Sequence, residues 1–358
     1  MTVPGLFTPL TIRGLTFPNR AWVSPMCQYS AVDGVVGDWH LVHLGGFSSG
    51  RAGLIMTEAT AVVPEGRISP DCPGLWNDEQ QHAWGRVVDY LHSQGSLVGF
   101  QLAHAGRKAS VAAPWRGGAP ITVSEGGWQT VGPSAVAFGQ MPVPRVMTAS
   151  DIQRTLDGFS AAAMRALSLD ADVIELHAAH GYLMHQFLSP LSNTREDEFG
   201  GSLENRMRLP LLVVAAVRAV WPSDRPLFMR ISTTDWAAGG WDLDQSVTLT
   251  ERLLDSGVDL IDASSAGLVA HQDVPDQVAY QTDLAASLRE RSGAFVAAVG
   301  RITEPGQANA LITSGQADAV FLARQLLRDP HWPLRAAHEL GADIDWRPQY
   351  LRAASWQS

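Results

Sequence analysis

Three side chains that can hold or transfer protons lie together near the middle of the chain, in the run His-Ala-Ala-His-Gly-Tyr. They are His177, His180 and Tyr182. Histidines at this spacing can present two nitrogens to one metal ion. They can also aim two N–H donors at one substrate oxygen. A third possibility, the commonest for an arbitrary pair of histidines in a turn, is a purely structural role.

The neighbouring residues separate these interpretations only in part. A metal site needs further ligands, and Glu175 precedes His177 by two positions. The next polar residue after the pair, however, is Tyr182, whose phenol suits proton donation better than metal ligation. The residues alone therefore rank a structural pair first, a pair of donors second and a metal site third.

Regular elements must position these groups, and the chain alternates short apolar runs with helical patterns. Helical periodicity occurs at 151–169, 209–220 and 246–255. The apolar runs are mostly continuous, as expected of parallel strands buried on both faces. Eight strand-then-helix units predict an α/β fold of the closed (β/α)8 type, a TIM barrel, with a doubly wound sheet as the rival. The predicted strands are 21–24, 54–57, 97–102, 173–176, 227–231, 260–263, 295–299 and 319–322.

In a (β/α)8 barrel the active site is built just beyond the C-terminal ends of the strands. Seven of the predicted strands carry polar or reactive groups there. The loops after the seventh and eighth strands are the usual phosphate site of this fold, and a glycine lets the backbone approach an anion closely. An arginine at a strand end can otherwise be a salt-bridge partner on the rim. The residues singled out at or just beyond these strand ends, polar and apolar together, are Ser24, Pro25, Met26, Cys27, Tyr29, Ala59, Gln101, His177, His180, Tyr182, Arg230, Gly300, Arg301, Ala323 and Arg324.

One interval between predicted strands is unusually long. It is rich in glycine, proline, serine and tryptophan, and a loop of this length in a compact domain is usually functional. We predict that residues 109–148 form a lid subdomain inserted after the third strand, within a single barrel domain that spans residues 1–358. The chain has no Gly-x-Gly-x-x-Gly motif, so any nucleotide would not be held in the Rossmann manner.

The composition of the chain limits which kinds of molecule it is expected to bind. The net charge of −10 and the lack of a basic block argue against nucleic acid, although a phosphate-bearing cofactor needs only a few local donors. No apolar run is long enough to span a membrane, and no signal peptide is visible at the N-terminus. Cys27 and Cys72 form no disulfide framework, which fits a reducing, cytoplasmic setting; each is interpreted as a small buried side chain.

Several of these segments resemble the old yellow enzyme family, in its thermophilic-like and xenobiotic-reductase branch. The resemblance lies in Pro-Met-Cys-Gln-Tyr at 25–29, Gln-Leu-Ala-His-Ala-Gly-Arg-Lys at 101–108 and the long run from Glu175 to Arg206. It extends to 300–303 and 323–330, and it covers the chain from about residue 6 onwards. Together these motifs are far more specific than any one of them.

The resemblance implies an FMN-dependent ene-reductase that uses NADPH or NADH and reduces α,β-unsaturated carbonyl or nitro compounds. It implies non-covalent FMN, with no metal. His177 and His180 would bind the substrate's activating oxygen, and Tyr182 would donate the proton. A metal-dependent barrel hydrolase using the two histidines and a non-catalytic flavin-binding protein are the alternatives. The residues implied to contact FMN are Ser24, Pro25, Met26, Cys27, Ala59, Gln101, Arg230, Gly300, Arg301, Ala323 and Arg324.

The C-terminal segment 346–358 carries three large side chains, Tyr350, Arg352 and Trp356. A free tail of this kind would fray, so these side chains need a surface to bury against, and their own barrel is the simplest one. In the family, the segment that 349–352 resembles reaches into a neighbouring subunit's site. The resemblance therefore implies a homodimer or homotetramer, with Tyr29, Arg352 and Trp356 as substrate contacts.

Overall fold

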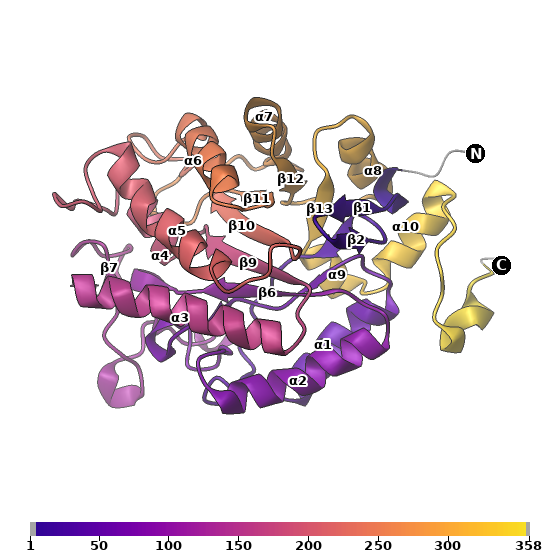
Figure 1. The fold of residues 1–358 in the computed structure, drawn as a ribbon, viewed down its shortest axis with the longest axis horizontal. Helices are drawn as coiled ribbons and strands as arrows, with labels where there is room; N and C mark the ends of the chain where they lie inside the picture. Colours follow the sequence, from indigo (N-terminus) through magenta and orange to yellow (C-terminus); the bar gives the residue numbers. More distant parts are fainter. Residues whose placement is uncertain (1–4, 356–358) are drawn as a thin grey trace.

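The computed structural model describes residues 5–355, and its centre is a closed parallel barrel (Figure 1). Strand β4 pairs with β3 on one side and β6 on the other, which joins the two ends of the sheet. The eight predicted strands and the (β/α)8 barrel are thus confirmed. The barrel strands are β3 (Ala21–Val23), β4 (Ile55–Met56), β6 (Val98–Ala103), β9 (Val173–Ala178), β10 (Leu227–Ser232), β11 (Leu260–Ser264), β12 (Phe295–Ala298) and β13 (Ala319–Leu322).

Helices surround the barrel, and several start earlier than their apolar periodicity predicts because a capping residue precedes them. Thr148 accepts a hydrogen bond from the backbone N–H of Asp151, and Ser202 and Asp242 cap the next two long helices in the same way. The helices are α1 (Asp38–Ser49), α2 (Asp78–Ser93), α3 (Ala149–Ser168), α4 (Leu183–Leu188), α5 (Leu203–Arg218), α6 (Leu243–Asp255), α7 (Thr282–Ser292), α8 (Pro305–Thr313), α9 (Arg324–Arg328) and α10 (Trp332–Leu340). No helix among the described residues is long and apolar enough to cross a membrane.

The N-terminal end of the barrel is filled with apolar side chains. The hairpin of β1 (Leu10–Ile12) and β2 (Leu15–Phe17) contributes Phe17 to a buried cluster inside the barrel. There Trp22 stacks on Phe228 with ring centroids 5.7 Å apart. Since this end is packed and apolar, polar side chains of the strands collect at the opposite, C-terminal end.

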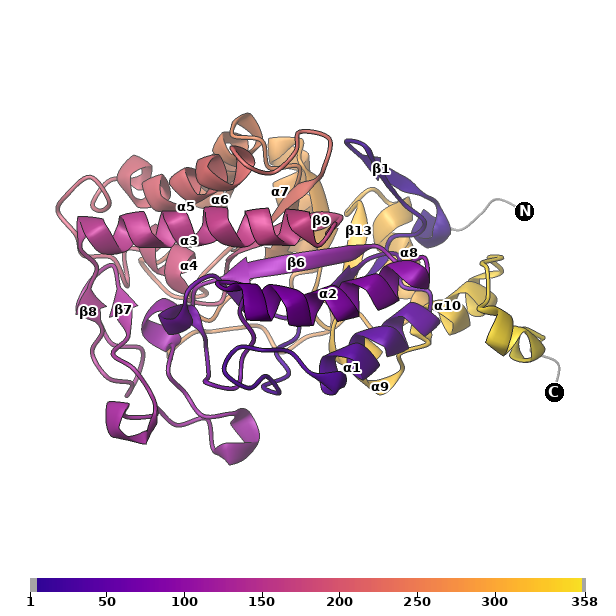
Figure 2. The ribbon, with the colours of Figure 1, turned by 60° about the horizontal axis from the view of Figure 1, so that its bottom comes forward.

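Residues 109–148 leave the barrel after β6 as a separate excursion. The excursion contains the 3-10 turns η4 (Pro114–Arg116) and η5 (Val123–Glu125) and the two-stranded parallel pair β7 (Val131–Gly132) and β8 (Arg145–Val146). Figures 1 and 2 show it at the end of the molecule opposite the β1–β2 hairpin, so it lies beside the C-terminal mouth. Its function as a lid stays a prediction. The remaining short elements are η1 (Gly5–Phe7), β5 (Thr60–Ala61), η2 (Pro64–Gly66), η3 (Gly106–Lys108) and η6 (Pro348–Ala353).

Candidate active site at the C-terminal mouth

The two histidines and the tyrosine of the central motif lie against one another at the end of β9. The ring centroid of His177 is 5.1 Å from that of His180 and 4.9 Å from that of Tyr182, both at nearly right angles. The Nδ1 atom of His177 accepts a hydrogen bond from the backbone N–H of Ala179 at 3.2 Å. This bond fixes the tautomer of His177 in which Nε2 carries the proton and can donate.

His180 is held by its backbone and by its ring. Its φ of 58° is left-handed, a conformation that costs free energy for a residue with a Cβ. Its backbone N–H donates to the Oγ of Ser232 at 2.9 Å, and its Nε2 lies 2.7 Å from the Oγ of Ser264. The other acceptor near this hydroxyl, Oε1 of Gln281, is 3.4 Å away. When the Ser264 hydroxyl donates to the nearer Nε2, the Nδ1 atom of His180 carries the proton and is free to donate.

Burial sets the protonation of all three groups. It lowers the pKa of His177 and of His180 well below the ordinary value, and the charge of Arg230 lowers both further. Burial also raises the pKa of Tyr182 well above its ordinary value. Near neutral pH the site therefore offers two uncharged imidazoles beside a phenol that keeps its proton.

A buried charged network lies beside this motif. In the strand register Arg230 of β10 is opposite both His177 and Asp262, and its Nε is 3.0 Å from the Oδ2 of Asp262. Gln101 donates from Nε2 to the Oε1 of Glu175 at 2.7 Å. Burial raises the pKa of Glu175 to about 8 and also raises that of Asp262. Arg230 is the cation beside both carboxyl groups, and Glu175 is mainly protonated near neutral pH.

The loop after β3 brings Cys27 and Tyr29 toward Tyr182. All three pack on a small buried cluster that includes Ala59 and Cys72. A hydrogen bond to Cys27, together with burial, raises the pKa of the Cys72 thiol. Sequence reasoning missed Cys72 because no motif surrounds it; only the folded chain brings it to Cys27.

A cavity of about 450 Å³ opens beside the ends of β12 and β13. The Arg301 guanidinium forms an ion pair with Asp276, with Nη1 2.5 Å from Oδ1, whereas Arg324 has no ion pair within residues 5–355. Gly300 has φ of +105°, and a Cβ there would lie 2.3 Å from Nε2 of Gln281. The residues predicted for a phosphate are thus gathered: the cavity is lined in part by Gly300, Arg301, Ala323 and Arg324.

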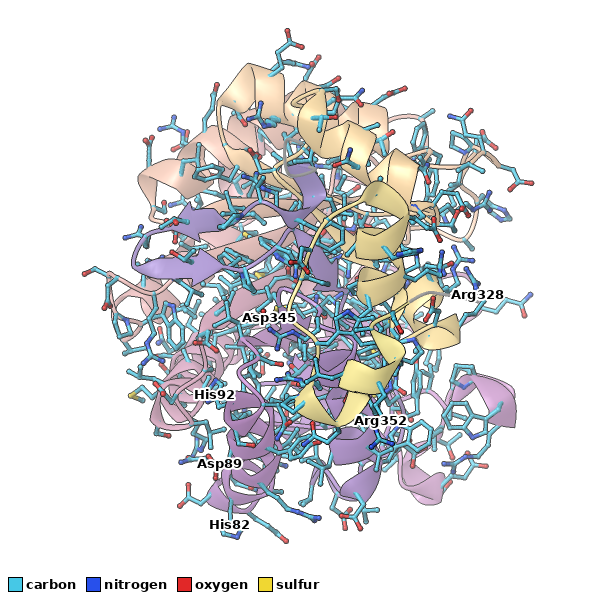
Figure 3. All side chains as sticks on the ribbon, turned by 90° about the vertical axis from the view of Figure 1, so that its right-hand side faces the viewer. His82, Asp89, His92, Arg328, Asp345 and Arg352 are labelled. Atoms are coloured by element: carbon cyan, nitrogen blue, oxygen red, sulfur yellow. The ribbon has the colours of Figure 1, made fainter. Side chains whose placement is uncertain are left out.

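One of the predicted substrate residues, Arg352, is not brought to this mouth. Arg352 is exposed on η6 in the C-terminal segment, as Figure 3 shows. Trp356 lies outside the described residues. The assignment of either residue to a neighbouring subunit's site stays a prediction. Among residues 5–355, no group of three or more His, Cys, Asp or Glu side chains is arranged to hold a metal ion.

Sequence reasoning also missed the residues that support the site from behind. His185 accepts from the backbone N–H of Gly181 at 2.9 Å through Nδ1, and its Nε2 is 2.8 Å from the Oδ1 of Asp235, with both side chains fully buried. On the other side, Glu58 accepts from the backbone N–H of Gln28 at 2.8 Å and pairs with His40. His185 and the Gln28 backbone belong to the motifs already noted, but their partners are distant in sequence.

The polar and titratable side chains described above converge on the C-terminal strand ends, which is where (β/α)8 enzymes carry their active sites. Residues 5–343 match the NADH:flavin oxidoreductase / NADH oxidase family. An NADPH dehydrogenase of Geobacillus thermodenitrificans is 44% identical over 351 residues, covering 97% of this chain and 98% of the relative. An NADH:flavin oxidoreductase of Gibberella zeae is 43% identical over 366 residues, covering 95% of this chain and 88% of the relative.

Solved structures of old yellow enzyme relatives have a similar fold. Morphinone reductase superposes with a TM-score of 0.79 at 28% identity, covering 97% of this chain and 93% of that one. The old yellow enzyme homologue from Zymomonas mobilis gives a TM-score of 0.79 at 26% identity, covering 99% and 97%. The chain belongs to the NADH:flavin oxidoreductase family, which includes the old yellow enzymes, and is an FMN-dependent oxidoreductase that uses NAD(P)H.

Proposed function

We propose that this enzyme reduces the activated C=C bond of α,β-unsaturated carbonyl or nitro compounds. The observation that carries the proposal is the contact among His177, His180 and Tyr182, which puts two neutral N–H donors beside a protonated phenol. An enone or nitroalkene needs both kinds of group, because its oxygen gathers negative charge while its α-carbon takes up a proton. Storage of a flavin alone would need neither.

The residues at the mouth fit FMN. For a phosphate, the cavity beside β12 and β13 offers Arg301, the close backbone approach at Gly300, and Arg324, which forms no ion pair with any of residues 5–355. Arg230 is a buried cation that would face the electron-rich edge of the ring system. When bound, FMN supplies the hydride transfer from the nicotinamide to the alkene. The proposed ring contacts are Pro25, Met26, Cys27, Ala59 and Gln101, and Ser24 is a further proposed FMN contact.

The histidine pair would bind the carbonyl or nitro oxygen. A neutral imidazole donates a hydrogen bond without giving up its proton, so the pair stabilises charge on that oxygen but does not protonate it. For His177 the donor is Nε2–H, because Nδ1 is already occupied by the Ala179 backbone. For His180 the donor is Nδ1–H, provided that Ser264 donates to Nε2.

Tyr182 would supply the proton for the α-carbon. Its pKa is raised well above the ordinary value by burial, so the phenol is in its donor form across the neutral range. Its ring sits at the N-terminal cap of α4, where the backbone N–H of Tyr182 donates to Ala179 O at 3.1 Å. The same turn thus positions the proton donor and the oxygen-binding histidines.

The test compares His177→Ala and His180→Ala with the wild type in separate half-reactions. Each variant, loaded with FMN and reduced without oxygen, is mixed with 2-cyclohexenone, and flavin reoxidation is followed. We expect reoxidation to slow about 10²- to 10³-fold in each variant, the usual cost of losing one oxyanion donor. Flavin reduction at saturating nicotinamide should change much less.

A matched control removes a histidine that lies elsewhere. His82→Ala alters an exposed residue on α2, on the outer surface seen in Figure 3, and should leave both half-reactions unchanged. Normal turnover of the enone by both His177→Ala and His180→Ala would show that the donor assignment is wrong. A wild-type enzyme that is reduced by the nicotinamide but is not reoxidised by enones or nitroalkenes would refute the proposed substrate class.

A further inference from the structure

The chain contains a single lysine. Lys108 is the only one among 358 residues, and every other member of the 26 lysines and arginines is an arginine. It ends η3, directly after β6, so it stands at the C-terminal mouth of the barrel. A lone lysine in an arginine-rich chain suggests a position where the shape of an ammonium matters and a guanidinium does not fit.

The ammonium group of Lys108 bridges two loops of the barrel. Its Nζ donates to the backbone O of His180 at 2.8 Å and to that of Gly267 at 2.9 Å. The first carbonyl belongs to the loop after β9 and the second to the loop after β11. The same nitrogen lies 4.4 Å from the ring centroid of Phe138 and 5.3 Å from that of Tyr182. Its hydrogen-bonding positions are therefore directed at backbone oxygens and aromatic faces.

The two bridged loops touch through their backbones. A Cβ on Gly181 would lie 2.1 Å from Gly267 O, and a Cβ on Gly267 would lie 2.6 Å from the Cα of His180. Only glycine permits such a close backbone contact. The same loop also contains the left-handed φ of 58° at His180. The carbonyl of His180 is thus fixed in a strained turn, where a donor of the right geometry is needed to satisfy it.

This arrangement is costly for a cation. No carboxylate lies within 4.0 Å of Lys108 Nζ in residues 5–355. Burial, together with the neighbouring charge of Arg107, lowers the pKa of Lys108 to about 8. A surface lysine would avoid this penalty, so the position is better explained by the two carbonyls it binds than by the stability of the fold.

We propose that Lys108 is a positioning residue for the substrate-oxygen site: by holding the carbonyls of His180 and Gly267 together, it fixes the imidazole of His180 where it can donate to the substrate. The inference rests on the proposed function of the histidine pair. The ring of His180 lies 2.7 Å from the Ser264 hydroxyl and packs edge-on against the His177 ring, and its backbone N–H donates to Ser232. Lys108 supplies the remaining constraint, on the carbonyl. An ammonium suits this task because its three N–H bonds diverge, whereas the N–H bonds of a guanidinium lie in one plane.

The experiment uses the FMN-loaded enzyme and two variants, Lys108→Met and Lys108→Arg. Lys108→Met keeps the length of the side chain and removes its charge and donors. Lys108→Arg keeps the charge in a planar group. Two quantities are measured: the Kd of phenol, followed by its long-wavelength charge-transfer absorbance, and kcat and KM for 2-cyclohexenone. Arg86→Met is the matched control, since Arg86 is exposed and pairs with Asp38 on the neighbouring helix α1.

We expect Lys108→Met to bind phenol about 10- to 100-fold more weakly and to lose kcat in the same range, the usual cost of displacing a positioned group. Lys108→Arg should bind FMN normally and still bind phenol several-fold more weakly. Both variants should retain the flavin content of the wild type, and Arg86→Met should behave as the wild type throughout. Lys108→Arg keeps the proposal testable if Lys108→Met does not fold.

The proposal is overturned if either folded variant binds phenol with wild-type affinity. It is also overturned if the loss appears equally in flavin content, because Lys108 would then support the barrel as a whole. The outcome for the substrate class is separate. If the wild type binds phenol but reduces no enone or nitroalkene, the proposed function fails, while the effect of Lys108 on phenol affinity still decides the positioning role.

Discussion

Replacement of Tyr182 by phenylalanine separates proton donation from every other contact of this residue. The phenylalanine ring can keep the edge-on contact with His177 at 4.9 Å and the backbone hydrogen bond to Ala179 at 3.1 Å. No hydrogen bond of the Tyr182 hydroxyl is present within the described residues, so Tyr182→Phe should change the free energy of unfolding by less than about 1 kcal/mol. The loss is then confined to the proton that the hydroxyl would deliver.

The size of that loss follows from general acid catalysis. A positioned acid contributes about 10²- to 10⁴-fold, equivalent to about 3–5 kcal/mol of activation free energy at 1.36 kcal/mol for each tenfold change. Anaerobic stopped-flow mixing of reduced Tyr182→Phe with 2-cyclohexenone should show flavin reoxidation slowed by this factor. Flavin reduction by the nicotinamide should stay close to that of the wild type, because it needs no proton from the phenol.

The pH dependence gives an independent check. Because burial raises the pKa of Tyr182 well above its ordinary value, the wild-type reoxidation rate should show no loss of activity from phenol ionisation between about pH 6 and 9. Tyr90→Phe, on the exposed side of α2, is the matched control. A Tyr182→Phe enzyme that is reoxidised within threefold of the wild-type rate would refute the assignment and would point to solvent as the proton source.

Three further predictions concern the cofactor, the buried carboxyl group and the C-terminus. Arg324→Ala should weaken FMN retention by about 1.5–3 kcal/mol, measured as the Kd in an ultrafiltration assay at low free FMN; unchanged occupancy would exclude Arg324 from the phosphate site. The raised pKa of Glu175, about 8, means that its neutral form is favoured by the fold, so stability present below its ordinary pKa is lost as the pH rises through 8. The free energy of unfolding of Glu175→Gln, measured with urea relative to that of the wild type, should therefore rise by about 2–5 kcal/mol from pH 5 to pH 8.5. A difference between the two proteins that does not change with pH would contradict this. Truncation after Asp345 should lower the oligomer mass in light scattering and raise the enone KM while FMN stays bound; unchanged mass and kinetics would end the proposal of a shared site.

The barrel and the line of site residues could be predicted from the sequence because both depend on local patterns. Continuous apolar runs mark strands buried on both faces, and the residue that follows each run must lie at the C-terminal mouth once the barrel closes. For this reason His177, Arg230 and Gly300 were expected at or beside the C-terminal ends of their strands, where the structure has them, whereas their functional roles stay predictions. The predicted start of α5, at residue 209, is several residues late and that of α3, at residue 151, is slightly late, since Ser202 and Thr148 cap these helices before their apolar faces begin.

The pairings within the site could not be predicted because they depend on strand register and on loop packing. Arg230 meets Asp262 only because β10 and β11 pair in one register, and no spacing in the sequence reveals it. Cys72 meets Cys27 through two loops that are 45 positions apart in the chain, as their numbers show. The left-handed φ of His180 and its bond to Lys108 likewise arise from the contact between two loops.

The order of proton affinities explains how neighbouring groups could take different roles in the proposed reaction. His177 and Tyr182 are in contact, yet burial shifts their pKa values in opposite directions, because burial disfavours the charged form and that form is the cation for histidine and the anion for tyrosine. A cationic histidine would be a competing acid at the substrate oxygen. The low pKa of the pair, lowered further by Arg230, removes that competitor and leaves Tyr182 as the acid. The same burial that makes the site costly to fold therefore separates charge stabilisation from proton delivery.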